Sequence, residues 1–125
     1  MKKIILILLI SFSAFSQKTI YNKTNKEGVF KEYQTKDGNT LKVGDTIVIG
    51  YPQGSEFRFI TQGNVGCASF LSNNKAVISK IKSVGNTTRG FKTYALFKGY
   101  GLSVYIDYEA ALETGEIKNP FTLIN

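Results

Sequence analysis

The chain has 125 residues, a formal net charge of +7 at pH 7, no histidine and one cysteine. The lack of histidine excludes Ser-His-Asp and Cys-His catalysis as they are usually built, and it removes the commonest ligand of transition metals. One cysteine forms neither an internal disulfide nor a zinc cluster, and the sequence has no phosphate-binding loop, dinucleotide fingerprint or EF-hand loop. We therefore expect no cofactor and no metal, and we assign no catalytic residue.

Residues 1–16 have the layout of a secretory signal peptide. Two lysines precede the apolar run Ile4–Ile10, and small and polar residues follow it. Ala14 and Ser16 fit a small-x-small pattern, which predicts cleavage before Gln17. The apolar run is too short for a membrane anchor, because a helix that spans the hydrocarbon needs about 20 residues. We expect a mature chain without a transmembrane anchor, located in the periplasm or outside the cell.

The rest of the chain predicts a small β-rich domain. Residues 17–27 are polar and predict a loose lead-in, and residues 28–125 predict a single β-barrel domain. Glycines recur along the chain between short runs rich in Val, Ile, Thr, Tyr and Phe, a pattern typical of small all-β folds. In chain order we expect strands at Val29–Thr35, Leu41–Ile49, Glu56–Thr61, Ala76–Val84, Phe91–Lys98 and Leu102–Tyr108.

The connections between these strands carry their own signals. The Asp-Gly pair in Lys36–Asn39 predicts a tight turn, because glycine supplies the positive φ that hairpins need. Gly44 predicts a bend within the second strand, and Asp45 suits a turn former better than a catalytic base. Residues 62–74 are the least regular part of the mature chain.

One short helix is expected at Asp107–Thr114. Asp107 suits the N-cap, Glu109 suits the first turn, and Gly115 suits the position after the helix. A helix of two turns needs tertiary packing to be stable, so its apolar side should face the sheet.

Strands without crossover helices predict an antiparallel meander. The economical way to remove the sheet edges in so short a chain is to curl into a small barrel, SH3-like or OB-like. The strand faces predict that the following residues form the core: Phe57, Phe59, Val77, Ile81, Phe91, Phe97, Val104 and Ile106.

Three stretches also resemble a group of proteins. Arg89–Tyr94 and Val104–Ile117 are similar to the C-terminal half of small exported bacterial β-barrel proteins of unassigned function, and Leu41–Thr46 is similar to one of their earlier strands. The resemblance covers about residues 41–117. It implies a shared fold and export, and it supplies no activity and no site residue.

Basic and aromatic residues alternate along the expected strands. From Phe57 to Ile106 there is no Asp or Glu, while seven Lys and Arg residues lie there. Cations beside aromatic rings form platforms on which barrels bind anionic polymers. The residues that we expect in such a face are Lys80, Lys82, Lys92, Tyr94, Lys98 and Tyr100. The alternative is a solvated lysine face in which Tyr94 and Leu96 cover a second side of the core.

Two further groups of residues carry weaker signals. Cys67 is expected in a loop, as a reactive thiol, a small buried apolar residue or a partner in an intermolecular disulfide, and nothing adjacent in sequence lowers its pKa. Glu109 and Glu113 are either a pair of catalytic acids or part of a solvated helix surface.

These observations favour a non-enzymatic, exported binding module for an anionic polymer or an envelope protein. Export argues against nucleic acid as the partner. A structural or assembly component of the envelope is the second hypothesis, and a small hydrolase is the third.

Overall fold

A computed structural model of the protein describes residues 18–24, 26–63, 65–98 and 103–121. The predicted signal peptide and Tyr100 lie outside these ranges. The described strands are β1 (Lys18–Ile20), β2 (Gly28–Phe30), β3 (Glu32–Gln34), β4 (Thr40–Lys42), β5 (Thr46–Val48), β6 (Glu56–Gln62), β7 (Val65–Ala68), β8 (Lys75–Val77), β9 (Lys80–Asn86), β10 (Gly90–Lys98) and β11 (Ser103–Asp107), and the described helices are the 3-10 helix η1 (Ser69–Leu71) and the α-helix α2 (Tyr108–Thr114).

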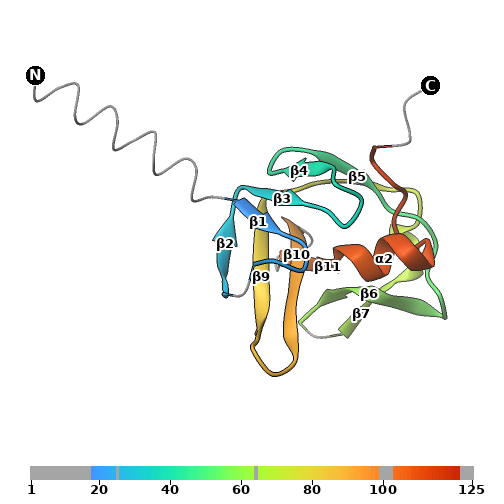
Figure 1. The fold of residues 1–125 in the computed structure, drawn as a ribbon. Helices are drawn as coiled ribbons and strands as arrows, with labels where there is room; N and C mark the ends of the chain where they lie inside the picture. Colours follow the sequence, from blue (N-terminus) through green and yellow to red (C-terminus); the bar gives the residue numbers. More distant parts are fainter. Residues whose placement is uncertain (1–17, 25, 64, 99–102, 122–125) are drawn as a thin grey trace, which may run out of the picture.

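The described strands form three sheets, none of which closes into a barrel (Figure 1). The largest has the order β2-β9-β10-β11-β6-β7, and its neighbours are antiparallel. In the second sheet β1 is parallel to β3, which is antiparallel to β4, and in the third β5 pairs with β8. A β-rich fold with one short C-terminal helix is therefore confirmed. The closed SH3-like or OB-like barrel is not, because the chain changes sheet repeatedly instead of following one meander.

Three strands that the sequence predicts as continuous are broken. Val29–Thr35 divides at Lys31 into β2 and β3, and Ala76–Val84 divides before Lys80 into β8 and β9. Leu41–Ile49 divides into β4 and β5. In each case the two halves join different sheets, because pairing with distant strands outweighs the local apolar pattern.

A turn at Gly44 and Asp45 separates β4 from β5. Gly44 has a φ of +99°, in the region that favours glycine. The Asp45 carboxylate accepts a hydrogen bond of 2.8 Å from the backbone N–H of Lys42. The turn-forming role predicted for Asp45 is confirmed.

The predicted loose lead-in contains an ordered strand. β1 pairs along its length with β3, and the Thr19 side chain between the sheets is fully buried. The backbone N–H of Ile20 donates a 2.7 Å hydrogen bond to the Thr24 hydroxyl. This segment is buried and paired because β3 lies beside it. The polar composition of the lead-in does not predict that pairing.

The core confirms most, but not all, of the predicted inward-facing residues. Phe59 and Phe91 are only partly buried, and Val77 is 58% exposed. Val77 lies on the face opposite to the predicted one because the break before β9 shifts the alternation, so that Ala76 and Ile78 point inward instead. The predicted core residues that are buried are Phe57, Ile81, Phe97, Val104 and Ile106.

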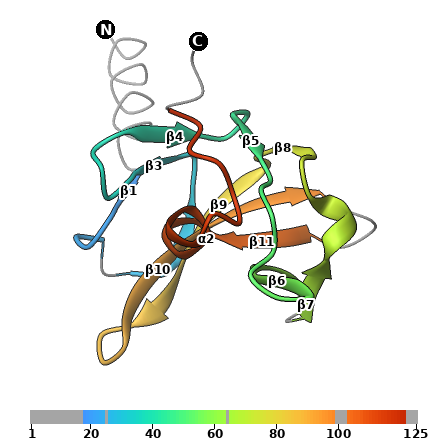
Figure 2. The same cartoon turned by 90° about the vertical axis from the view of Figure 1, so that its right-hand side faces the viewer.

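The helix α2 lies where the sequence predicts it. Gly115 has a φ of +82° and closes the helix with a hydrogen bond from its N–H to the carbonyl of Leu112. Tyr108 is buried, and its ring meets Tyr33 of β3 edge to face at 5.8 Å between centroids. Figure 2 looks along the helix and shows the sheets arranged around it.

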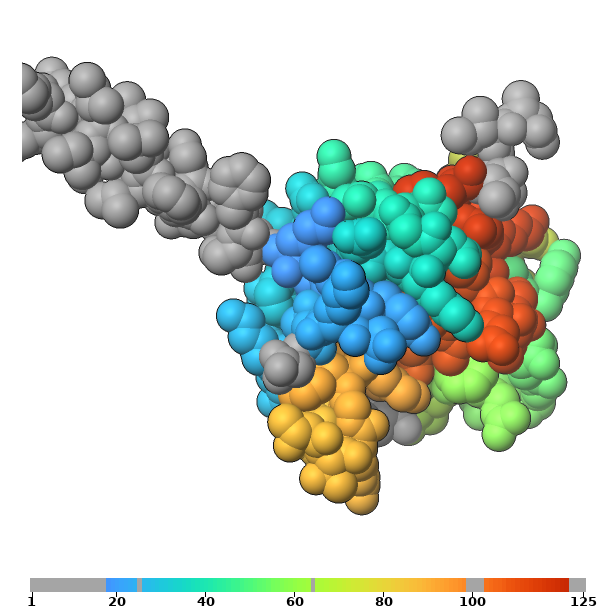
Figure 3. Space-filling view, in the orientation of Figure 1, coloured from blue at the N-terminus to red at the C-terminus, as the bar shows by residue number. Residues whose placement is uncertain are grey.

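The N-terminal strands and α2 lie together on one side of the molecule. In Figure 3 the segments of β1, β3 and β4 form a continuous surface with α2, and the β9–β10 hairpin projects beside them. This layer packs on the apolar face of the large sheet, where Ile81, Ala95 and Ile106 are buried.

A buried carboxylate fastens the segment after α2 to β6. The side chain of Glu116 is completely buried, and its oxygens accept hydrogen bonds from the backbone N–H groups of Gln53 (2.9 Å), Arg58 (2.9 Å) and Phe59 (2.7 Å). Hydrogen bonds to a charged acceptor are stronger than those between neutral groups. One side chain thereby joins the loop before β6, the start of β6 and the end of the helix.

The backbone beside Glu116 is held as closely. The N–H of Gly50 donates a 2.8 Å hydrogen bond to the carbonyl of Glu116. A Cβ atom at Gly50 would collide with the carbonyl oxygen of Gly115. Glycine is needed at position 50 because two backbone segments touch there.

Replacing Glu116 with alanine should strongly destabilise the protein. Each buried N–H that loses its acceptor costs about 1–3 kcal/mol, so we expect the free energy of unfolding to fall by about 3 kcal/mol or more. Urea unfolding measures the change. Glu113→Ala, an exposed glutamate on α2, is the control and should change stability by less than about 0.5 kcal/mol. Equal effects of the two substitutions would contradict the role of Glu116.

Candidate functional site

The strand register gathers the predicted basic residues on one face of the large sheet. Lys82 of β9 and Asp107 of β11 lie opposite Tyr94 of β10, on its two sides. Lys80 and Tyr105 in the same way flank Leu96. Paired residues in antiparallel strands share a face. We call this surface, formed by Lys80, Lys82, Lys92, Tyr94, Lys98 and Tyr105, the basic strand face.

A cation and two rings form the centre of the basic strand face. The amino group of Lys82 lies 5.5 Å from the centroid of the Tyr105 ring and 3.2 Å from its hydroxyl. Tyr105 meets Tyr94 edge to face at 5.9 Å. Tyr105 was not among the predicted site residues. In the sequence, its alternation with Val104 and Ile106 predicts only that the Tyr105 side chain points away from the core. It does not predict which residues of other strands Tyr105 contacts.

Lys92 is the one predicted lysine whose charge is compensated by an ion pair in the described chain. Its amino group lies 3.1 Å from a carboxylate oxygen of Asp107. The hydrogen bond and the attraction of Asp107 raise the pKa of Lys92. Asp107 precedes α2 but makes no side-chain capping hydrogen bond, so the predicted N-cap role is replaced by this pairing.

Lys80 and Lys98 are the freely presented cations of the face. Both are exposed, and they lie at the same end of the β9–β10 pair. Leu96, which lies opposite Lys80 in the register, is buried and gives the face an apolar floor. Tyr100 lies outside the described residues.

The two helix glutamates, Glu109 and Glu113, lie in different surroundings. Glu109 accepts hydrogen bonds from the hydroxyl of Tyr33 and, at 3.0 Å, from the backbone N–H of Lys36. Burial raises the pKa of the Tyr33 phenol, and its hydrogen bond to the Glu109 carboxylate raises it further. Glu113 is exposed. Glu109 is thus a structural acceptor rather than part of a solvated surface, because β3 reaches the helix from a distant part of the chain.

Both glutamates line a cavity of about 430 Å³ between the N-terminal strand and the turn end of the β9–β10 hairpin. Arg89 and Lys92 line the same cavity, together with Asp107. Glu109 is engaged there by Tyr33 and Lys36, and Asp107 by Lys92, whereas Glu113 is exposed. This cavity therefore holds mixed charge and does not present two free carboxylates.

Cys67 lies in β7, not in a loop. It is buried and lines an apolar cavity of about 270 Å³ together with Phe70 and Val104. Burial raises the pKa of the thiol, and the nearby carboxylate of Glu56 raises it further. A thiol of this kind is protonated at neutral pH and is a weak nucleophile.

No protein-family model, curated protein or solved structure matches the chain. The resemblance in residues 41–117 therefore gains no family from these comparisons. Within the described ranges, no helix is long and apolar enough to cross a membrane. No cluster of three or more His, Cys, Asp or Glu residues suited to a metal ion occurs in that part of the chain.

Cys67 should react slowly with iodoacetamide. The raised pKa leaves little thiolate at roughly pH 7.5, and burial blocks approach of the reagent, so we expect alkylation at least about tenfold slower than in the urea-unfolded protein. Mass spectrometry follows the reaction, and the rate should rise only as the pH is raised well above neutrality. Equal rates in the folded and unfolded protein would show an accessible, activated thiol and would revive the hydrolase hypothesis.

Proposed function

We propose that this protein is an exported, non-enzymatic binding module, and that its basic strand face binds an anionic polymer. Export rests on the signal-peptide pattern of residues 1–16. The observation that carries the binding proposal is the gathering of Lys80, Lys82, Lys92 and Lys98 around the Tyr94–Tyr105 pair.

Charge balance supports an anionic partner. Asp107 is the one acid among the strand residues of this face that the structure describes, and Lys92 already compensates it. The remaining lysines raise the local concentration of anions, because exposed charges act over about 8–10 Å at physiological salt. Tyr94 and Tyr105 supply ring surface against which sugar rings can pack. We also propose that the fold is related to SH3-like or OB-like domains, which bind ligands on such strand faces.

The chemistry of the described residues favours binding over catalysis. Glu109 and Glu116 are occupied as hydrogen-bond acceptors, and the Cys67 thiol is buried. None of these three side chains offers a free acid or nucleophile in a cleft.

A second candidate function is a structural or assembly component of the envelope. Val65, Phe70 and Val77 are each at least 58% exposed, around β7 and β8 at the margins of their sheets. Exposed apolar side chains beside open strand edges are typical of surfaces that join other chains.

Charge reversal at the two exposed lysines tests the first candidate. We expect Lys80→Glu with Lys98→Glu to weaken binding of heparin, a sulfated glycan probe, at least about tenfold, because like charges then meet the polymer. Binding of heparin to the unaltered protein should also weaken about tenfold or more between roughly 50 and 200 mM salt. Fluorescence anisotropy measures both effects. Lys92 is left intact because its loss would strand the buried Asp107.

The matched control is Lys36→Glu with Lys118→Glu, which changes net charge equally at exposed positions outside the basic strand face. We expect this control to change affinity less than about threefold, since distant exposed charges are screened. Polygalacturonate serves as a carboxylated probe and single-stranded DNA as a polyanion without sugar rings of the glycan type. Absence of binding at low salt, or equal losses in the two double variants, would contradict the proposal.

A further inference from the structure

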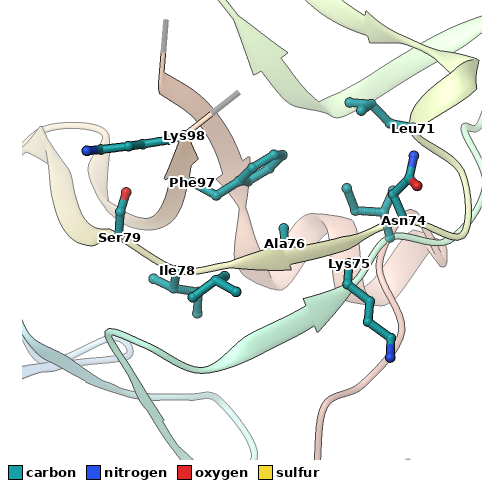
Figure 4. A pocket seen from close by; sticks show the side chains of 10 residues that line it. Leu71, Asn74, Lys75, Ala76, Ile78, Ser79, Phe97 and Lys98 are labelled. Carbon is teal, nitrogen blue, oxygen red and sulfur yellow. The ribbon is translucent and has the colours of Figure 1, made fainter. Parts of the chain in front are cut away.

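A groove opens where β8 diverges from the end of β10. Its volume is about 720 Å³, within the range of ligand-binding clefts. Apolar side chains of Leu71, Ala76 and Phe97 line it, and Lys75 and Lys98 are also among its lining residues. Figure 4 shows both lysine side chains extending away from the Phe97 ring. In the same view the Phe97 ring lies over the backbone of β8, on the side away from β5.

The backbone of β8 has one paired edge and one open edge. On the paired edge, Ile78 N–H donates to the carbonyl of Asp45 at 2.9 Å, and the carbonyl of Asn74 accepts from Ile49 N–H at 2.8 Å. Hydrogen-bonded and non-hydrogen-bonded residues alternate along an antiparallel strand. Between Asn74 and Ile78, the residues that alternate with the hydrogen-bonded ones therefore direct their N–H and C=O groups to the other edge of β8.

Those residues are Lys75 and Val77, which lie opposite Val48 and Thr46 in the register. Both are exposed. Their peptide groups face the groove, so β8 offers two donors and two acceptors beside an apolar floor. This is the geometry to which an extended peptide adds as a further strand.

We propose that the groove binds an extended acidic peptide segment, which pairs with the open edge of β8. Alternate apolar side chains of the peptide pack against Leu71 and Phe97, and the side chains between them face outward. The flanking charges choose the partner, because Lys75 and Lys98 line the groove and none of the residues that line it is acidic. This site is separate from polymer binding at the basic strand face, although Lys98 borders both.

A second copy of the chain fits the groove less well. Pairing two β8 edges would bring the Lys75 residues of both copies into the same small sheet, and like charges on neighbouring strands are destabilising. The net charge, which is +7 for the whole chain and +5 without Lys2 and Lys3 of the predicted signal peptide, also opposes self-association.

The first probe is an octapeptide of alternating valine and glutamate, capped at both ends. We expect it to bind at low salt, and we expect the corresponding valine–lysine peptide to bind at least about tenfold more weakly. Two N-methylated versions, one methylated at every valine and one at every glutamate, test the backbone pairing. Only one set of peptide N–H groups faces β8, so one version should lose binding and the other should keep it.

Hydrogen exchange of the full chain gives an independent readout. In the free protein we expect the amides of Lys75 and Val77 to exchange fast and that of Ala76, which faces β5, to exchange slowly. The valine–glutamate peptide should slow exchange at Lys75 and Val77.

Two substitutions test the edge. Val77→Pro removes the N–H that faces the groove while leaving the bonds to β5, and Lys75→Glu reverses the flanking charge. Each should weaken peptide binding about tenfold, while the controls Val77→Ala and Lys118→Glu change it less than about threefold. Heparin binding should be unaffected by Val77→Pro, which separates failure of this proposal from failure of the proposed function.

Three results would overturn the proposal. The first is no binding of the valine–glutamate peptide at about 1 mM. The second is equal affinity of the two N-methylated peptides for the unaltered protein, or unchanged affinity of the Val77→Pro variant for the valine–glutamate peptide. The third is protection of Lys75 and Val77 that depends on protein concentration without peptide, which would assign the groove to a second copy.

Discussion

The buried carboxylate of Glu116 is the interaction on which the arrangement of this protein most depends. Three backbone N–H groups from the loop before β6 and from β6 itself converge on it. A buried charge is tolerated only when such donors replace water, so the carboxylate needs the three N–H groups to be held in place around it. It fixes the end of α2 against β6, and the close approach at Gly50 fixes the neighbouring backbone. The helix, too short to be stable alone, is held at both ends by long-range contacts.

This attachment gives the large sheet two different faces. One is covered by α2 and by the strands β1, β3 and β4, and it carries the apolar core. The other presents Lys80, Lys82 and Tyr94 in register across neighbouring strands. The proposed binding functions follow from this asymmetry: polymer binding uses the outer face, and peptide binding uses the edge that β8 leaves open where it diverges from β10.

The sequence predicted local features well and long-range pairings poorly. The helix and its end at Gly115 followed from capping residues, and the inward face of β10 followed from alternation, since both signals lie within a few residues. The parallel pairing of β1 was not visible, because its burial depends on β3. Val77 lies on the unexpected face because the change of sheet between β8 and β9 breaks the alternation. Tyr105 was missed because its partners, Lys82 and Tyr94, lie on other strands. For Glu116, nothing in the neighbouring residues signals a buried acid, because its donors come from residues 53–59.

We propose that the outer face of β9, β10 and β11, and not the covered side, binds anionic polymers. The most direct measurement is an amide chemical-shift map of the isotope-labelled protein titrated with a short heparin oligosaccharide. We expect the perturbed amides to cluster at residues 80–84, 92–98 and 103–107, with little change in α2 and β3. Perturbations centred on α2 and the cavity beside Glu113 would contradict it.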